Sequence, residues 1–540
     1  MASVPSAHVD SFTRDNLPPR EQWPDLIFTL PELAYPDQLN CGEELLDATI
    51  AQRGGERRCL VSDAGSWSYE ELRRRVDQVA HLLAGELGVV PGQRVLLRGA
   101  NSAWMVASWL AVMKAGAVAV ATMPLLRAAE LRPIVERSRP ALALCDVRLL
   151  DALRDAAPTL PLIPVGGESA DDLVRRAAAM PDRFAAVRTA ADDVCLIAFT
   201  SGTTGQPKGC MHLHRDVLAI ADTFSRRVLQ PRQDDLFVSG PPLAFTYGLG
   251  GTVVFPLRAG ASSLLVERAS PELLAEAMAR HSATVLLTSP TAYRAMLKLD
   301  GTDLGSLRRC VSAGEPLSRS TWEAWRDATG LGIVDGIGST EMLHIFISEC
   351  DEGIRPGATG RVVPGYEARV VDDSLAPVGD GEVGRLAVRG PTGCRYLADP
   401  RQGDYVQGGW NLTGDAYVRD GDGYYWFMAR ADDMIISAGY NIAGPEVEDA
   451  LLRHADVSEA AVIGVPDAER GSIVKSFVVL REGVLPSPQT AAALQEFVKS
   501  VIAPYKYPRA IEFRASLPRT ATGKLQRYRL REGVAPGSAR

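Results

Sequence analysis

The chain has 540 residues, of which 46% are hydrophobic and 23% are charged, which is the composition of an ordinary globular protein. This composition excludes a disordered, collagen-like or coiled-coil protein, and the length predicts about three or four folding units. The 58 Lys and Arg residues and the 66 Asp and Glu residues give a formal net charge of −8, so no net attraction draws the chain to nucleic acid or to an anionic membrane.

The first 40 residues are rich in proline, and we expect them to wrap the surface. They lack the apolar core of a secretory signal peptide. The longest apolar stretch, residues 104–126, is interrupted by Lys114 and Gly116 and is too broken to span a membrane. The eight cysteines form no CxxC pair and none stands at zinc-ligand spacing with a histidine, a pattern typical of buried thiols in a reducing compartment. We therefore expect a soluble cytoplasmic protein.

Strands and helices alternate through the first part of the chain. A helix is predicted after Ser68, because Ser68 and Glu71 form a capping box and apolar residues follow at helical spacing. Continuous apolar strands separated by helices predict a parallel sheet that is covered on both faces. The strands are expected at residues 94–99, 117–123 and 141–146, and the helices at 103–116 and 129–138.

The alternation restarts at residue 194 and continues to about residue 345, which predicts a second α/β unit. Its strands are expected at residues 194–199, 262–267, 283–288 and 308–314, and its helices at 217–229, 270–282 and 319–330. Between residues 358 and 428, short alternating strands separated by Gly and Pro turns predict an antiparallel sheet or a small barrel. The remaining segment mixes strands and helices, so we expect a small α+β domain there.

A loop rich in glycine and hydroxyl side chains follows the strand at 194–199. Glycines let backbone N–H groups turn inward around an anion, hydroxyl groups add donors, and a lysine adds a positive charge. The loop is not a Walker A motif, since Pro207 precedes Lys208. The pattern favours a phosphate site, and the alternative is a plain surface loop. The candidate phosphate ligands are Thr200, Ser201, Gly202, Thr203, Thr204, Gly205 and Lys208.

The string TSGTTGQPKG, residues 200–209, resembles the phosphate loop of the adenylate-forming superfamily, which includes acyl- and aryl-CoA synthetases, adenylation domains and beetle luciferases. Further motifs of that superfamily follow in the same order, and the resemblance covers about residues 50–530. These motifs are SAGEP at 312–316, GSTE at 338–341, TGD at 413–415, RADD at 430–433 and PRTATGK at 518–524.

The resemblance implies an α/β fold with two domains. The large N-terminal domain, residues 1–431, would contain two doubly wound α/β subdomains and a small β-barrel-like subdomain, and would bind ATP and the acid. A small, mobile α+β domain, residues 432–540, would carry the catalytic Lys524. Asp432 would be the hinge about which this domain turns.

The superfamily reaction has two halves. A carboxylate attacks the α-phosphorus of ATP to give an acyl-adenylate and pyrophosphate, and a thiol, usually that of coenzyme A, then displaces AMP. Because negative charge accumulates on the phosphates, the site needs positioned cations and donors. The resemblance assigns Lys208 to the β- and γ-phosphates, Thr340 to the α-phosphate and Glu341 to Mg²⁺, which prefers oxygen ligands. Lys524 would bridge the substrate carboxylate and the developing negative charge. The alternative is that Lys524 is a solvated surface lysine.

The resemblance also implies where the rest of the nucleotide and coenzyme A bind. Asp415 and Arg430 would hold the ribose, although TGD also fits a plain turn. Gly439 would leave space for the pantetheine arm, and an ordinary turn glycine is an equal alternative. The expected adenine-side residues are Gly314, Glu315, Pro316, Asp335, Gly336 and Ile337.

Two segments resemble the acid pocket of the benzoate-CoA ligase branch, DGIGSTEMLHIF at 335–346 and PLAFTYG at 242–248. The N-terminal strings at 11–24 and 30–41 look more like 2-aminobenzoate-CoA ligases. Phenyl rings in such a pocket suit a flat aromatic acid, and His344 could meet the carboxylate or an ortho substituent. The expected substrate residues are Ala244, Phe245, Tyr247, Ala313, Gly338 and His344.

The sequence therefore predicts an AMP-forming aryl-CoA ligase that uses ATP, Mg²⁺ and coenzyme A. The best substrate is 2-aminobenzoate, followed by benzoate or a hydroxybenzoate. One alternative is a stand-alone adenylation enzyme that loads a separate carrier protein. Another is a non-catalytic nucleotide-binding regulator, which the presence of the full set of charged motif residues argues against. We expect a monomer or homodimer without a nucleic-acid or membrane partner.

Overall fold

A six-stranded sheet organises the first third of the chain, in the order β6-β5-β3-β4-β7-β8, and every strand is parallel to its neighbour except β8. The computed structural model describes residues 5–200, 207–299, 303–430, 433–437, 440–467, 470–519 and 525–532. The strands of this sheet are β3 (Arg94–Arg98), β4 (Val118–Thr122), β5 (Leu142–Asp146), β6 (Leu162–Val165), β7 (Val194–Thr200) and β8 (Lys208–Leu213).

The position of β7 and the edge strand β8 corrects one prediction. The sequence assigned residues 194–199 to the start of the second α/β unit, whereas β7 pairs with β4 and so belongs to the first sheet. Hydrophobic periodicity locates a strand but contains no information on its partner. β8 returns antiparallel to β7, with Thr200 opposite Lys208. Lys208 therefore begins the strand at one edge of the first sheet.

A second, nine-stranded sheet follows in the order β15-β14-β13-β12-β11-β9-β10-β1-β2. The last two strands in this order, β1 and β2, come from the N-terminal part of the chain. β1 joins the sheet by pairing parallel with β10. The central strands are parallel, while β14 and β15 continue the sheet antiparallel. The strands are β1 (Arg58–Ser62), β2 (Gly65–Ser68), β9 (Leu236–Ser239), β10 (Ser262–Leu264), β11 (Val285–Thr288), β12 (Arg309–Ser312), β13 (Ile333–Gly338), β14 (Ile345–Ser348) and β15 (Arg361–Val362).

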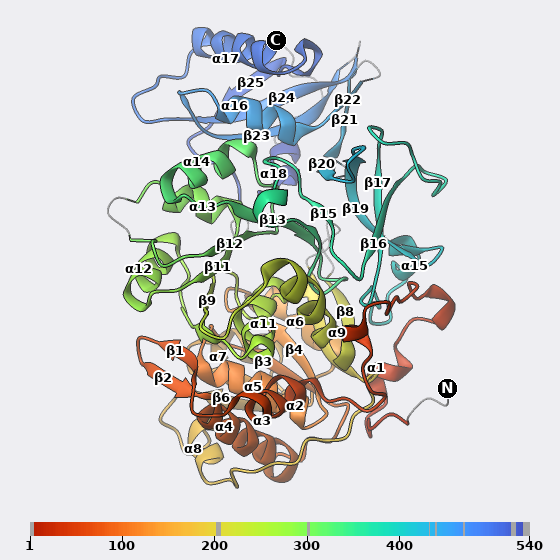
Figure 1. Ribbon diagram of the computed structural model, residues 1–540, viewed down its shortest axis with the longest axis vertical. Helices are drawn as coiled ribbons and strands as arrows, with labels where there is room; N and C mark the ends of the chain where they lie inside the picture. The colour runs from red at the N-terminus through yellow and green to blue at the C-terminus, as the bar shows by residue number, and fades with distance from the viewer. Residues whose placement is uncertain are drawn as a thin grey trace.

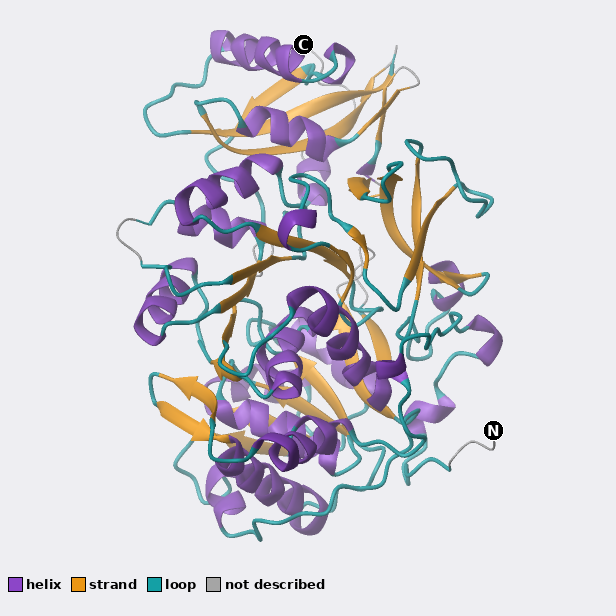
Figure 2. Cartoon of the chain, in the orientation of Figure 1, coloured by secondary structure: helices purple, strands orange, loops and turns teal. Residues whose placement is uncertain are grey.

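Helices lie against both sheets (Figure 2). One continuous core contains Trp109 of α5, Phe224 of η5 and Leu287 of β11, so the two sheets share their packing. The longer helices are α4 (Tyr69–His81), α5 (Ala103–Lys114), α6 (Ala128–Ser138), α7 (Leu150–Ala156), α9 (His214–Ile220), α12 (Pro271–His281), α13 (Pro290–Met296) and α14 (Arg319–Thr329). The nine-residue η5 (Ala221–Leu229) continues α9. The shorter helices are α8 (Leu173–Ala178), α10 (Thr246–Leu249), α11 (Phe255–Ala259), η3 (Leu82–Glu86), η4 (Val147–Leu149) and η6 (Gly250–Val254).

The start of α4 confirms the predicted capping box. Ser68 Oγ accepts the Glu71 backbone N–H at 3.1 Å, and Glu71 Oε2 accepts the Ser68 N–H at 2.8 Å. These two bonds satisfy backbone donors that a helix start otherwise leaves unpaired. Before this helix the chain forms short helical segments, α1 (Phe12–Asp15), η1 (Arg20–Gln22), η2 (Pro31–Leu33), α2 (Cys41–Leu45) and α3 (Asp47–Arg53).

The region between residues 358 and 430 forms the expected antiparallel sheet, in which β16, β17, β19 and β18 follow one another and β20 pairs with β19. Its core residue Leu386 joins the same core as the two larger sheets. The elements are β16 (Glu367–Val371), β17 (Val383–Arg389), β18 (Val406–Gln407), β19 (Trp410–Arg419) and β20 (Tyr425–Arg430), with η7 (Asp351–Gly353) before them and α15 (Gln402–Tyr405) among them.

The C-terminal elements form an α+β unit at one end of the molecule, blue in Figure 1. It has its own core, which includes Val447, Val462 and Leu494. Ser320 Oγ of α14 donates to Asp449 Oδ1 of α16 at 3.2 Å, which links the unit to the larger part. The elements are β21 (Ile435–Ser437), β22 (Tyr440–Ile442), α16 (Gly444–Leu452), β23 (Val457–Asp467), β24 (Gly471–Leu480), α17 (Pro488–Val501), η9 (Pro504–Lys506), β25 (Ala510–Phe513) and α18 (Arg527–Glu532).

Candidate active site

The fold brings together Lys208 and Glu341, the residues expected at the phosphates and at Mg²⁺. Lys208 is the first residue of β8 in the first sheet, and Glu341 lies in the turn between β13 and β14 of the second. Lys208 Nζ is 3.5 Å from Glu341 Oε1, and Glu341 is only 7% exposed. Thr340 precedes Glu341 in the same turn. A cation and a carboxylate are therefore held at one point between the two sheets.

Two tyrosines that the sequence did not single out complete this cluster. The Tyr396 hydroxyl donates to Glu341 Oε1 at 2.5 Å and accepts from Lys208 Nζ at 2.6 Å. The Tyr405 hydroxyl is 3.3 Å from Ser339 Oγ, and its ring lies 5.8 Å from Lys208 Nζ. Burial and the nearby Glu341 carboxylate raise the pKa of Tyr396, so its phenol keeps the proton that it donates. None of the motifs quoted above includes residues 393–400, and the contact becomes visible in the fold.

The two predicted ribose residues form a pair across a hairpin. Asp415 of β19 lies directly opposite Arg430 of β20, and Arg430 Nη1 donates to Asp415 Oδ1 at 2.9 Å. Thr413 Oγ1 accepts the Asp415 backbone N–H at 3.2 Å. Gly414 between them has a φ of +76°, a conformation that residues with a side chain rarely adopt. The TGD string therefore fixes the direction of the Asp415 carboxylate.

The predicted adenine-side residues come from two neighbouring strand ends. Ser312 of β12 pairs with Asp335 of β13, so the loop carrying Gly314, Glu315 and Pro316 leaves the sheet beside Asp335. Glu315 Oε2 accepts the Thr291 hydroxyl at 2.6 Å, while Gly314 and Pro316 are exposed. Gly336 and Ile337 follow Asp335 along β13.

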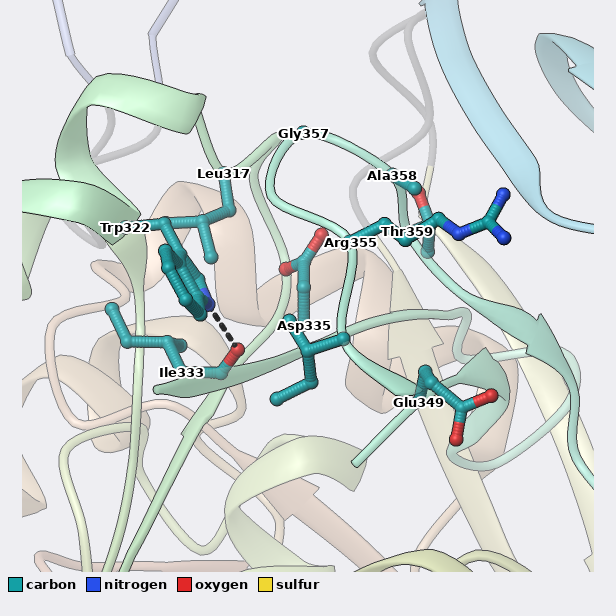
Figure 3. Close-up of a pocket in the computed structure, with 10 residues that line it drawn as sticks. Leu317, Trp322, Ile333, Asp335, Glu349, Arg355, Gly357, Ala358 and Thr359 are labelled. Atoms are coloured by element: carbon teal, nitrogen blue, oxygen red, sulfur yellow. Dashed lines mark hydrogen bonds between the residues drawn. The ribbon is translucent and has the colours of Figure 1, made fainter. Parts of the chain in front are cut away.

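A small pocket of about 10 Å³ lies next to Asp335, as Figure 3 shows. Trp322 closes one side and donates its indole N–H to the Ile333 carbonyl at 2.9 Å. Segment 355–359 closes another side. Burial raises the pKa of the Asp335 carboxyl group to about 8, and its Oδ1 has no hydrogen-bond partner among the described residues. The pocket has room for about one water molecule, which is far too little for an adenine ring.

Three aromatic rings surround the side chain of His344. Its ring centroid lies 4.5 Å from that of Phe255, 5.4 Å from that of Phe224 and 5.5 Å from that of Tyr247. Within the described part of the chain neither ring nitrogen of His344 has a hydrogen-bond partner. Burial lowers the pKa of His344 to about 3, so the imidazole is neutral near pH 7.

The other predicted substrate residues lie on segments around this aromatic cluster. Tyr247 of α10 contacts it directly and donates its hydroxyl to the Val311 carbonyl at 3.1 Å. Ala313, just beyond β12, is buried. Ala244 and Phe245 are half-buried and immediately precede α10.

The turn from Gly338 to His344 connects the charged cluster to the aromatic one. A Cβ atom on Gly338 would lie 2.6 Å from the His344 carbonyl oxygen, so the close approach requires glycine. Leu343 in this turn has a φ of +68°, a strained conformation for a residue with a side chain. The turn presents Glu341 to Lys208 and His344 to the rings of Phe224 and Phe255.

Comparisons with known proteins show the family of the chain. Residues 46–396 match the AMP-binding enzyme family, and residues 446–524 match the AMP-binding enzyme C-terminal domain. The chain belongs to the AMP-binding enzyme family.

Several relatives of this AMP-binding enzyme match it over nearly their whole lengths. Benzoate–CoA ligase of Thauera aromatica is 36% identical, with 93% of this chain and 98% of the relative covered. The 4-hydroxybenzoate–CoA/benzoate–CoA ligase of Rhodopseudomonas palustris is 36% identical, with 92% and 95% covered. The crystal structure of the anthranilate CoA ligase AuaEII in complex with anthranoyl-AMP has a TM-score of 0.88 at 35% identity, with 93% and 98% covered.

These matches confirm the expected fold of the adenylate-forming superfamily and its benzoate-CoA ligase branch. The AMP-binding enzyme described here is an acid–thiol ligase. No helix within its described residues is both long and apolar enough to cross a membrane.

Several predicted site residues of this AMP-binding enzyme lie outside the described residues. Thr200 ends β7 and is described. The residues outside are Ser201, Gly202, Thr203, Thr204 and Gly205 of the phosphate loop, the hinge residue Asp432, Gly439 and the catalytic lysine Lys524. Their predicted roles remain predictions.

The cysteines of the AMP-binding enzyme are buried as expected, apart from the partly buried Cys350. Cysteine spacing does not reveal one grouping that the fold brings together: Cys41, Cys195 and His214 place their ligand atoms within 4.8 Å of one another. His214 Nδ1 already accepts the backbone N–H of Cys41 at 3.1 Å and lies 3.2 Å from Cys41 Sγ. These contacts link the first residue of α9, His214, to the first residue of α2, Cys41. The sequence could not reveal this contact because it joins positions far apart in the chain.

Proposed function

We propose that the protein is an ATP-dependent aryl-CoA ligase, with 2-aminobenzoate as its best substrate and benzoate or a hydroxybenzoate next. The observation that carries this proposal is the aromatic enclosure of His344, which shares one turn with Glu341. Flat rings favour packing against aromatic side chains. A carboxylate on such a ring would point toward the charged end of the turn. The names of the two benzoate–CoA ligases above support the same class of acid.

The neutral imidazole of His344 favours an acid with a polar ortho substituent. With a pKa lowered to about 3, the ring offers one donor and one acceptor nitrogen near pH 7. Both nitrogens lack partners among the described residues, and an unpaired buried polar atom is costly. An amino group beside the carboxylate would satisfy the acceptor nitrogen. The structural relative bound to anthranoyl-AMP supports this choice.

In adenylation, each charged residue would contact a different part of the bound nucleotide or metal. Lys208 would neutralise the β- and γ-phosphates with residues 200–205, and Thr340 would contact the α-phosphate. The Glu341 carboxylate fits Mg²⁺, because it is an oxygen ligand beside the expected phosphate position. Bound Mg²⁺ would neutralise phosphate charge. Asp415 and Arg430 would hold the ribose.

The remaining nucleotide contacts would come from the strand ends of the second sheet. The 314–316 loop and Asp335, Gly336 and Ile337 would flank the adenine. Their neighbouring positions at the ends of β12 and β13 support this assignment.

The C-terminal unit would complete the site as a mobile domain. We place the domain boundary between residues 431 and 432, with Asp432 as the hinge, Lys524 as the adenylation lysine and Gly439 beside the pantetheine arm. A separate core in the C-terminal unit supports independent movement. The contact between Ser320 and Asp449 would then break and re-form as the domain turns.

The test is formation of AMP with ATP and Mg²⁺, with and without coenzyme A. The acids to compare are benzoate, 2-aminobenzoate, salicylate, 4-hydroxybenzoate and a medium-chain fatty acid. We expect CoA-dependent turnover with the highest kcat/KM for 2-aminobenzoate. Turnover that requires a carrier protein instead of coenzyme A would move the enzyme to the alternative function. Preference for the fatty acid would contradict the aromatic pocket.

A His344→Phe variant separates the two parts of the proposal. It keeps an aromatic ring at the position and removes both nitrogens. We expect benzoate turnover to persist while the preference for 2-aminobenzoate over benzoate drops by roughly tenfold, the value of about one buried hydrogen bond. An unchanged preference would exclude His344 as the group that recognises the ortho substituent.

A further inference from the structure

Tyr396 occupies the point where the cation and the carboxylate of the site meet. Its hydroxyl lies 2.5 Å from Glu341 Oε1 and 2.6 Å from Lys208 Nζ, both shorter than the direct distance of 3.5 Å between Nζ and Oε1. The phenol therefore mediates the contact between the two charged groups. Hydrogen bonds to charged groups are the stronger class in proteins.

The backbone holds Tyr396 in register with the strand that carries Lys208. Tyr396 forms an antiparallel bridge with Cys210 of β8. Leu397 donates its N–H to the Gly209 carbonyl at 2.8 Å, and Met211 donates its N–H to the Arg395 carbonyl at 2.7 Å. Segment 395–397 thus extends the edge of the first sheet, beside the start of β8.

Side chains fix Tyr396 further. Gln402 Oε1 accepts the Tyr396 backbone N–H at 2.8 Å, and Gln402 is itself buried. The Tyr396 ring meets the Tyr405 ring edge to face at 5.8 Å, and its residue exposure is 0%. The hydroxyl cannot swing away from Glu341 without disturbing this packing.

The arrangement leaves the second carboxylate oxygen of Glu341 uncommitted. Of the two carboxylate oxygens of Glu341, only Oε1 accepts hydrogen bonds from the described residues, namely from Tyr396 and Lys208. A carboxylate with one oxygen fixed has a defined orientation and offers the other oxygen to a ligand. Such support of a metal-binding carboxylate by a neighbouring hydrogen bond is a common way to tune a metal site.

We propose that Tyr396 is a positioning residue for Mg·ATP, which orients the Glu341 carboxylate toward the divalent cation and the Lys208 ammonium toward the phosphates. This inference rests on the proposed function, because that function supplies ATP and Mg²⁺ as ligands. Tyr396 acts through Glu341 and Lys208. A purely structural role, as a buried ring packed on Tyr405, is the alternative that the test must separate.

The deciding variant is Tyr396→Phe, which keeps the ring and removes the hydroxyl. Its control is Tyr69→Phe, which removes another buried hydroxyl, one that donates to the Ala261 carbonyl at 2.6 Å far along the chain from the site. Each variant and the parent protein are titrated with ATP in a calorimeter, once in the presence of Mg²⁺ and once in EDTA. The four affinities of the two variants are then compared with the two affinities of the parent.

We expect Tyr396→Phe to weaken binding of Mg·ATP by roughly tenfold or more and to reduce binding of metal-free ATP less. Tyr69→Phe should leave both affinities unchanged even where it lowers the thermal unfolding midpoint. The KM for the aromatic acid should also stay unchanged in Tyr396→Phe. Parent-like binding of Mg·ATP by folded Tyr396→Phe would overturn the inference.

A Glu341→Gln background provides the second measurement. If Tyr396 acts through Glu341, the further loss caused by Tyr396→Phe should shrink in that background, and purely additive losses would contradict the inference. Should Tyr396→Phe fail to fold, Tyr396→His provides a second variant, because its shorter ring cannot place a donor at the position of the hydroxyl. Weakened binding of Mg·ATP by Tyr396→His would support the inference, and parent-like binding would contradict it. A parent protein that binds Mg·ATP but activates no aromatic acid would contradict the proposed function alone.

Discussion

Asp415 and Arg430 face each other across the hairpin of β19 and β20, with Arg430 Nη1 at 2.9 Å from Asp415 Oδ1. The Asp415 side chain is 12% exposed and that of Arg430 is 45% exposed. The carboxylate is thus held by the hairpin while the guanidinium reaches toward solvent. A carboxylate oriented in this way is prepared to accept hydrogen bonds from two adjacent hydroxyl groups.

The first prediction concerns Asp415→Asn. The amide keeps the size of the side chain but removes the charge that strengthens its hydrogen bonds, so we expect the KM for ATP to rise roughly 10- to 100-fold. The KM for the acid should change little. The measurement is pyrophosphate release as a function of ATP concentration. Asp373→Asn, at a fully exposed carboxylate, is the control and should behave as the parent does. An unchanged KM for ATP would remove Asp415 from the nucleotide site.

Gly338→Ala tests whether the tight turn holds the site together. The added Cβ would lie 2.6 Å from the His344 carbonyl oxygen and 2.9 Å from the Ile345 nitrogen, so the backbone must move. We expect a loss of about 1–3 kcal/mol in the free energy of unfolding and a fall in kcat/KM for the acid, because Glu341 and His344 share this turn. Thermal unfolding and steady-state kinetics measure the two effects.

Gly421→Ala is the matched control for that substitution. Nothing lies within 4 Å of a Cβ atom built at Gly421, which is exposed. It should leave both stability and kinetics near parent values. A Gly338→Ala enzyme with parent stability would mean that the turn adjusts without cost.

Local features of the fold were predictable from the sequence, whereas long-range partners were not. The Ser68–Glu71 capping box depends on residues three positions apart, and the structure confirms it. The resemblance of the motifs likewise implied that Lys208 and Glu341 lie near each other, and their side chains are 3.5 Å apart in the structure. The assignment of β7 to the second unit was wrong because periodicity does not specify a partner strand. Tyr396 and Lys208 are 188 positions apart in the chain, and their contact follows from the bridge between Tyr396 and Cys210. Pairing between such distant segments could not be predicted from hydrophobic periodicity.

The buried His344 predicts an acid-sensitive protein. Its pKa is lowered from 6.5 to about 3 by burial, so between these values the unfolded chain binds a proton that the folded protein does not. The free energy of unfolding should therefore fall as the pH drops below 6.5. At pH 5 this residue alone should cost about 2 kcal/mol relative to pH 7. Urea unfolding at the two pH values measures the loss.

The His344→Asn variant isolates that contribution. Because asparagine does not titrate, the variant should lose about 2 kcal/mol less than the parent between pH 7 and pH 5, whatever its stability at pH 7. A His344→Asn protein as acid-sensitive as the parent would show that other groups dominate.

The last prediction concerns Arg395, the residue before Tyr396. Its fully buried guanidinium donates to Asp216 Oδ2 at 2.8 Å and stacks on Trp23, with 4.6 Å from Cζ to the ring centroid. Arg395→Met would leave the Asp216 carboxylate buried without its cation, so we expect a loss of about 3–5 kcal/mol in the free energy of unfolding. Arg154→Met, which breaks an exposed ion pair with Asp151, should cost less than about 1 kcal/mol. Adding Asp216→Asn to Arg395→Met should restore part of the loss, since it removes the buried charge that has lost its partner. Urea unfolding of Arg395→Met, Asp216→Asn and the double variant measures this coupling, and simple addition of the two single losses would refute the account.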